Sequence, residues 1–183
     1  MGRLTKYLDD KGMADNTILM FFPDNGAPDG PYSGAKSSHM DGGTRVPCFF
    51  RWPGGGFGGA GKGRDIETLM WVCDLIPTFM DILDFEDVPS RPEKLKLHGM
   101  SFYPMLDEDP SNDLPEYKNR IIYNSNQRVY NVKKYKQTSM KKDVWNGNEL
   151  QYKFRLVTDG GNTWKLSDVK TDPRQSRNIS GAH

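Results

Sequence analysis

Long apolar runs are absent from this chain. No run approaches the roughly 20 residues that a membrane-spanning helix needs, and the longest one is broken by Pro23 and Asp24. The first ten residues, MGRLTKYLDD, also lack the apolar segment of a signal peptide. The sequence therefore predicts no membrane span.

A large charge of either sign is also missing. The chain has 25 lysines and arginines against 24 aspartates and glutamates, which gives a net charge of +1. Nucleic acid and membrane surfaces attract proteins with a clustered basic excess, so neither class of partner is expected. Cysteine is scarce. Cys48 and Cys73 both lie in apolar runs, and we expect buried free thiols rather than a disulfide or a metal pair.

The most informative stretch covers residues 17–53. Its two apolar runs, residues 18–22 and 46–52, predict buried strands joined by a polar loop. Continuous apolar strands of this kind are typical of a parallel or mixed sheet that helices cover. The loop contains Asp24, Asn25 and Lys36, and loops held by a rigid scaffold often carry functional side chains.

Helical periodicity marks three other segments. Residues 3–11 predict a helix, and residues 102–106 predict a short one. Residues 66–83 have helical spacing but contain Pro77. Because proline is tolerated in a first helical turn, we expect two helical pieces there, with residues 74–77 opening the second.

The last third of the chain predicts antiparallel strands separated by polar turns. These strands are expected at residues 120–124, 128–133, 152–158 and 163–169. Residues 84–115 are rich in turns and charge, so we predict one domain over residues 1–110 and a smaller one over residues 111–183.

Five segments, taken in order, carry a resemblance that no single one would support. They are GRLTKYLDDKGMADNTILMFFPDNG, GAKSSHMDGGTRVPCFFRWPGG, DLIPTFMDIL, LHGMSFYPML and RLVTDGGNTWKLSDVKTDPRQSRNIS. Together they resemble the C-terminal portion of arylsulfatase-type sulfatases, in the alkaline-phosphatase superfamily. The resemblance implies an α/β fold: the C-terminal part of an alkaline-phosphatase-like α/β/α sandwich, followed by a small antiparallel β (α+β) subdomain.

The resemblance also implies roles for individual residues. Asp24 and Asn25 match ligands of a divalent cation, usually calcium, and a hard cation prefers such oxygen ligands. Lys36 matches the lysine that holds a sulfate oxygen, where its charge can stabilise the leaving oxygen as the S–O bond breaks. His39 is a candidate neighbour of the substrate. Such enzymes are periplasmic, secreted or lysosomal.

Other interpretations stay open. Asp-Asn-Gly alone is a common turn sequence, and a lone Lys36 would be solvated. Phosphate and phosphonate ester hydrolases of the same superfamily bind similar tetrahedral oxyanions. The chain is also compatible with a split-off module that binds or supports without catalysis. Asp41 stands where the family more often has glutamate.

One part of the family's machinery is missing from these 183 residues. Sulfatases carry a Cys/Ser-x-Pro-x-Arg motif, oxidised to formylglycine, and two further metal-binding aspartates in an N-terminal half. Residues 87–91, DVPSR, have aspartate at the oxidisable position, and neither Cys48 nor Cys73 is followed by Pro-x-Arg. We therefore expect the N-terminal half of the same protein as the partner, and no hydrolysis of sulfate esters by this chain alone.

Overall fold

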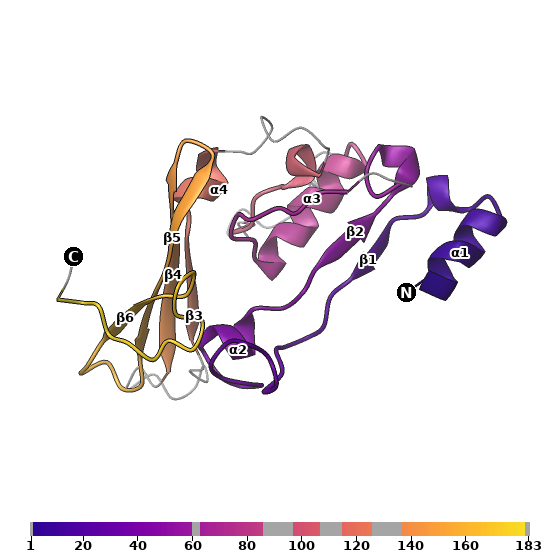
Figure 1. Cartoon of the computed structure of the whole chain (residues 1–183). Helices are drawn as coiled ribbons and strands as arrows, with labels where there is room; N and C mark the ends of the chain where they lie inside the picture. The colour runs from indigo at the N-terminus through magenta and orange to yellow at the C-terminus, as the bar shows by residue number, and fades with distance from the viewer. Residues whose placement is uncertain (1, 60–62, 86–96, 107–114, 126–136, 182–183) are drawn as a thin grey trace. The chain divides into compact units, whose positions relative to one another are not determined.

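The computed structural model describes residues 2–59, 63–85, 97–106, 115–125 and 137–181 (Figure 1). The chain forms two compact units, each built from two separate parts of the sequence. The first comprises Met1–Met20 and Phe49–Tyr117, and the second comprises Phe21–Cys48 and Lys118–His183. The predicted domain boundary at residue 110 stays a prediction. The polar loop is in the same compact unit as the C-terminal strands.

The first unit combines a two-stranded sheet with short helices. Its elements are α1 (Gly2–Asp10), η1 (Ala14–Asn16), β1 (Leu19–Phe21, whose last residue begins the second unit), β2 (Phe49–Arg51), η2 (Pro53–Gly55), η3 (Val72–Asp74), α3 (Leu75–Ile82) and η4 (Tyr103–Met105). The helices predicted at residues 3–11 and 102–106 are confirmed, the second as a single 3-10 turn. Among the described helices, none is long and apolar enough to cross a membrane.

The two strands predicted around the polar loop form, but they are shorter and more open than expected. β1 and β2 pair with each other in a two-stranded sheet. The predicted burial on both faces is wrong, because a two-stranded ribbon leaves much of its surface uncovered: Phe21 is 41% exposed and Phe49 is 62% exposed. Cys48, next to β2, is exposed for the same reason, although the predicted free state of both cysteines is confirmed.

The core of the first unit includes residues of η4, and partly buried residues of β2 and α3 pack against it. It contains the buried side chains of Phe57, Phe102, Met105, Leu106 and Tyr117. Only the second helical piece predicted for residues 66–83 forms fully. α3 has Pro77 in its first turn, whereas residues 66–71 are not helical.

The second unit contains a four-stranded antiparallel sheet in the order β3-β4-β5-β6 (Figure 1). The strands are β3 (Ile121–Ser125), β4 (Thr138–Asn146), β5 (Glu149–Thr158) and β6 (Lys165–Asp168), and α4 (Pro115–Asn119) precedes them. Three of the predicted strands are confirmed. The fourth, at residues 128–133, lies outside the described residues, as does the DVPSR segment.

Strand β4 is absent from the sequence prediction. Its side chains alternate in burial, with Ser139, Lys141 and Asp143 buried. Because the inward positions are polar and charged, the segment lacks the apolar alternation by which a half-buried strand is normally identified.

Candidate functional site

Asp24 and Asn25 lie in the turn that follows β1, here called the Asp-Asn turn (residues 24–26). Asp24 is exposed, and its carboxylate has no hydrogen-bond or ion-pair partner among the described residues. Asn25 is half-buried, and its Nδ2 donates to the carbonyl of Gly26 at 2.9 Å. This bond anchors the nitrogen of the carboxamide, so the Oδ1 oxygen is the end available to a ligand. Two oxygen donors therefore stand side by side in the sequence.

Lys36 lies in a second turn, here called the lysine turn (residues 34–38). Gly34 has φ +94° and Ser37 has φ +68°, and the Ser38 N–H donates to the carbonyl of Ala35 at 2.9 Å. These conformations reverse the chain and place Lys36 at its exposed tip. Within the described part of the chain, its ammonium forms no hydrogen bond or ion pair.

The short helix α2 (Asp41–Thr44) contacts both turns. The Gly26 N–H donates to the carbonyl of Gly43 at 3.1 Å. A Cβ atom on Gly42 would lie 2.3 Å from the carbonyl oxygen of Gly34, and one on Gly43 would lie 2.4 Å from that of Ala35. The glycine pair thus lets backbone approach backbone, and the structure brings the Asp-Asn turn and the lysine turn together on α2.

Four buried charges join α2 to the C-terminal sheet. Lys141 Nζ lies 2.8 Å from Asp41 Oδ1. Arg155 Nε donates to both carboxylate oxygens of Asp41, at 3.2 and 3.1 Å, and Arg155 Nη1 donates to Asp143 Oδ1 at 2.8 Å. All four side chains are buried. We call Asp41, Lys141, Asp143 and Arg155 the charge cluster.

The charge cluster was not predicted from the sequence. Its signal is the placement of Lys141 and Asp143 two residues apart in β4, with Lys153 and Arg155 likewise two apart in β5. Side chains two residues apart in a strand share one face. Charges of both signs on the same face of neighbouring strands therefore mark an internal ion cluster.

Burial and neighbouring charges act against each other in the cluster. Burial lowers the pKa of Lys141, although Asp41 raises it. Burial acts to raise the pKa of the Asp41 carboxyl, but Lys141 and Arg155 lower that pKa below its ordinary value. Burial acts to lower the pKa of Arg155, whereas the two carboxylates raise it. Burial raises the pKa of Asp143 despite the attraction of Arg155. Asp41 and Arg155 are therefore both charged at neutral pH.

His39 lies on the buried side of the loop. The residue is 5% exposed, and its carbonyl accepts a hydrogen bond from Ser139 Oγ at 2.7 Å. Both ring nitrogens lack a hydrogen-bond partner within the described residues, and Nε2 lies 3.9 Å from Asp159 Oδ1. Burial lowers the pKa of the imidazole, with Asp159 opposing and Lys141 adding to the shift. A place for His39 beside the substrate stays a prediction.

The oxygen donors of the Asp-Asn turn fit a hard divalent cation in part. A carboxylate and a carboxamide oxygen are ligands that calcium prefers, but calcium normally gathers about six to eight oxygens. Among the described residues, no group of three or more His, Cys, Asp or Glu side chains could hold a metal ion. Asp24 and Asn25 can therefore supply part of a cation site.

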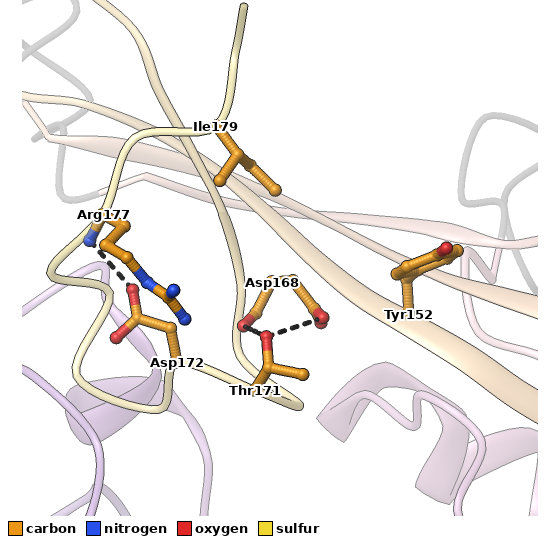
Figure 2. A pocket seen from close by; sticks show the side chains of 6 residues that line it. All are labelled: Tyr152, Asp168, Thr171, Asp172, Arg177 and Ile179. Atoms are coloured by element: carbon orange, nitrogen blue, oxygen red, sulfur yellow. Dashed lines mark hydrogen bonds between the residues drawn. The ribbon is translucent and has the colours of Figure 1, made fainter. Parts of the chain in front are cut away.

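A separate cavity of about 250 Å³ lies at the C-terminal end of the second unit (Figure 2). It is lined by Tyr152, Asp168, Thr171, Asp172, Arg177 and Ile179. Both of its carboxylates have partners: Asp168 accepts a hydrogen bond from Thr171 Oγ1 at 3.1 Å, and Asp172 accepts one from the Arg177 N–H at 2.9 Å (Figure 2). These bonds fold the turn after β6. The cavity includes none of the predicted site residues.

Comparison with known proteins connects the chain to one family. Residues 1–85 match the family model named Sulfatase. The chain is 36% identical over 113 residues to the uncharacterized sulfatase YdeN of Escherichia coli, a match that covers 58% of this chain and 19% of that protein. It is 26% identical over 182 residues to an N-acetylglucosamine-6-O-sulfatase of Bacteroides thetaiotaomicron, covering 99% of this chain and 29% of that protein.

Two solved structures share the fold. The PsFucS1 sulfatase from Pseudoalteromonas sp. matches with a TM-score of 0.64 at 20% identity, over 97% of this chain and 35% of that one. A phosphonate monoester hydrolase of Agrobacterium radiobacter matches with a TM-score of 0.62 at 21% identity, over 98% and 34%. The predicted fold, a C-terminal part of the alkaline-phosphatase-like architecture with a small antiparallel subdomain, is therefore confirmed.

The chain spans about a fifth to a third of the length of these curated relatives. Its family match, its sulfatase relatives and its fold agree with one another. The chain is therefore similar in sequence to sulfatases, with the family-model match over residues 1–85, and it has the fold of one part of the two solved structures.

Proposed function

We propose that this chain supplies one wall of the active site of a sulfuric ester hydrolase. The observation that carries this proposal is the shared platform: the Asp-Asn turn and the lysine turn both contact the glycine pair of α2. Asp24 and Lys36 are both exposed, and neither has a hydrogen-bond or ion-pair partner among the described residues. An anion-binding cation beside metal-binding oxygens suits a substrate with a negatively charged tetrahedral group.

Each residue has a role in this proposal. Asp24 and Asn25 would hold calcium, which would neutralise negative charge on the sulfate. Lys36 would bind a non-bridging sulfate oxygen and stabilise the charge that develops on the leaving oxygen. Exposure of Lys36 keeps its ammonium free for that contact. His39 would border the substrate. Its imidazole ring would approach the substrate from the buried side of the loop, in the neutral form.

The remaining wall would come from an N-terminal half of the same protein. That half would contribute the formylglycine nucleophile and the other oxygen ligands of calcium. The names of the relatives, which include an N-acetylglucosamine-6-O-sulfatase and a steryl-sulfatase, support a sulfate monoester as the substrate class. By this proposal the 183 residues alone hydrolyse no sulfate ester.

A second candidate is hydrolysis of a phosphate or phosphonate ester. The phosphonate monoester hydrolase of similar fold supports it, because the superfamily's sites accept related tetrahedral anions. Two-metal phosphatases usually add histidine ligands, whereas the loop pairs its Asp-Asn turn with a lysine. We therefore favour the sulfate ester.

The test uses the protein encoded by the whole open reading frame that contains this sequence. Initial rates would be compared for an aryl sulfate, an aryl phosphate and an aryl phosphonate at equal concentration. We expect kcat/KM to be greatest for the sulfate, and a Cys/Ser-x-Pro-x-Arg motif to be encoded upstream in frame. Preference for either phosphorus ester would support the second candidate. No hydrolysis of any ester would favour a non-catalytic module.

A further inference from the structure

We propose that the charge cluster is a positioning device for the candidate site. It fixes α2 to the C-terminal sheet and, through α2, sets the geometry of the Asp-Asn turn and therefore its affinity for calcium. Asp41, Lys141, Asp143 and Arg155 are positioning residues in this scheme, since none belongs to either turn. The inference rests on the proposed role of Asp24 and Asn25.

Helix α2 cannot hold its own position. It has four residues, two of which are glycines. An isolated helix of one turn is unstable in water, and glycine lowers helix stability further, by about 1 kcal/mol per residue relative to alanine. The placement of α2 must therefore come from contacts with the rest of the fold.

Strand β4 supplies these contacts from two adjacent positions on one face. Ser139 Oγ donates to the carbonyl of His39 at 2.7 Å, just before the helix. Lys141 Nζ contacts Asp41 in the first turn and also donates to Thr44 Oγ1 at the end of the helix, at 2.5 Å. The strand therefore holds the segment before α2 and both of its ends.

The cluster is balanced in charge. It has two carboxylates and two cations, and Arg155 bridges Asp41 to Asp143. Burying an unpaired charge is strongly unfavourable, so the lowest-energy arrangement keeps each of the four charged groups in contact with its partner. An apolar contact would tolerate sliding of so short a helix, whereas the directional bonds of the guanidinium to Asp41 do not.

Backbone contacts with α2 determine where the two turns lie. The Gly42 N–H donates to the carbonyl of Ser33 at 2.7 Å, beside the lysine turn, and the Gly43 carbonyl accepts from the Gly26 N–H. A Cβ on Gly26 would lie 1.9 Å from the Gly42 oxygen, so the Asp-Asn turn is in direct contact with the helix. Metal ligands need placement to within about 0.5 Å, and a shift of α2 would misplace them.

The experiment is a titration of the 183-residue chain with calcium chloride, followed by NMR at the side-chain amide of Asn25. We expect weak saturable binding, with a dissociation constant on the order of 10⁻³ M. In the double variant Asp41→Asn/Lys141→Met, one charge of each sign is removed and Arg155 keeps Asp143. We expect the dissociation constant of this variant to rise about tenfold. Asp41→Glu, which keeps the carboxylate, should stay within about twofold of the wild type.

Two further variants separate positioning from general loss of stability. Asp168→Asn alters another buried carboxylate of the same sheet, one that binds the Lys153 and Lys170 N–H groups and has no contact with α2 in the structure. Its calcium affinity should equal that of the wild type. Thr44→Val removes a partner of Lys141 without unbalancing the charges, and covers the case in which the double variant does not fold. We expect it to weaken binding about threefold.

Each outcome has a distinct meaning. If Asp24→Asn abolishes the calcium response while the folded double variant and Thr44→Val bind like the wild type, the positioning role is wrong and the proposed function survives. Equal weakening by Asp168→Asn would also overturn positioning. If the wild-type chain shows no calcium response at Asn25, or Asp24→Asn leaves the response unchanged, the metal role of the turn itself is wrong.

Discussion

Gly42 and Gly43 show how single residues decide the shape of the loop. Their hydrogen atoms leave room for the carbonyl groups of the lysine turn, at separations where a methyl group would overlap backbone atoms. Backbone cannot yield as a flexible side chain can, so a larger residue must displace a turn. The Gly-Gly pair is thus a packing requirement.

Substitution of Gly42 by alanine should destabilise the protein. The new Cβ would meet the carbonyl oxygens of Gly34 and Ser33 at 2.3 and 2.5 Å. We expect the free energy of unfolding in urea to fall by about 1–3 kcal/mol. Gly160→Ala is the matched control, because a Cβ there meets nothing within 4 Å. Equal, small effects for both variants would contradict the proposed packing.

His39 should make stability depend on pH. Burial lowers the pKa of its imidazole below the ordinary value of 6.5, so below that pH the unfolded chain binds more protons than the folded one. Stability should therefore fall as the pH drops from the unfolded pKa through the folded pKa. Two charged groups act on the ring: Asp159 raises the pKa and so opposes this effect, whereas Lys141 lowers the pKa and adds to it.

A His39→Gln variant tests this directly by thermal unfolding at pH 7.5 and pH 5.5. It removes the titrating ring, so the loss of Tm between the two values should be smaller than in the wild type by about 2–4 °C. His98→Gln, at an exposed position, should leave the wild-type pH dependence intact. A wild-type Tm that rises on acidification would mean that His39 is protonated in the fold.

At the scale of elements, Asp74 organises the start of α3. Its carboxylate accepts hydrogen bonds from the Trp71 N–H at 2.7 Å and from the Met100 N–H at 3.0 Å, and the residue is fully buried. Thr78 Oγ1 donates to the Asp74 carbonyl and accepts from the Phe102 N–H at 3.1 Å. The Asp-Leu-x-Pro-Thr segment thus joins α3 to the turn that leads into η4.

Replacement of Asp74 by alanine should weaken this connection strongly. Two backbone N–H groups would lose their acceptor, and each buried unsatisfied group costs about 1–3 kcal/mol. We expect a loss of at least about 2 kcal/mol in the free energy of unfolding, measured by urea denaturation. Asp81→Ala, at an exposed position on the same helix, should change it by less than about 0.5 kcal/mol. Similar values for the two variants would exclude the capping role.

Elements with ordinary patterns were predictable, and those shaped by distant contacts were not. α3 and the strands β1, β2, β3, β5 and β6 follow apolar periodicity and the position of Pro77. β4 was missed because its inward residues include charges. Lys141 pairs with Asp41, 100 residues away along the chain, and Asp143 pairs with Arg155, 12 residues away. Residues 66–71 have helical spacing but do not form a helix. The Asp74 carboxylate accepts a hydrogen bond from the Trp71 N–H, and the helix begins only after that point.

For the whole molecule, the roles of the candidate site residues stay predictions from the sequence, and the contacts that support their turns were not predicted. Asp24, Asn25 and Lys36 were identified from an ordered set of motifs, and the structure places their turns on one helix. The charge cluster that holds this helix has a local signal only in the spacing of charges within β4 and within β5. Which of these charges pair depends on which strands are neighbours in the sheet. The site therefore involves the loop and the C-terminal strands as one unit.

The most direct measurement is the rate of hydrolysis of 4-nitrophenyl sulfate by the protein encoded by the whole open reading frame, with formylglycine installed, as wild type and as Lys36→Met. We predict turnover by the wild type and a fall in kcat of about 10²–10³ in the variant, with Lys11→Met, another exposed lysine, unchanged. The 183-residue chain alone should show no turnover. Turnover by the isolated chain, or an unchanged rate in Lys36→Met, would contradict the proposed division of the site.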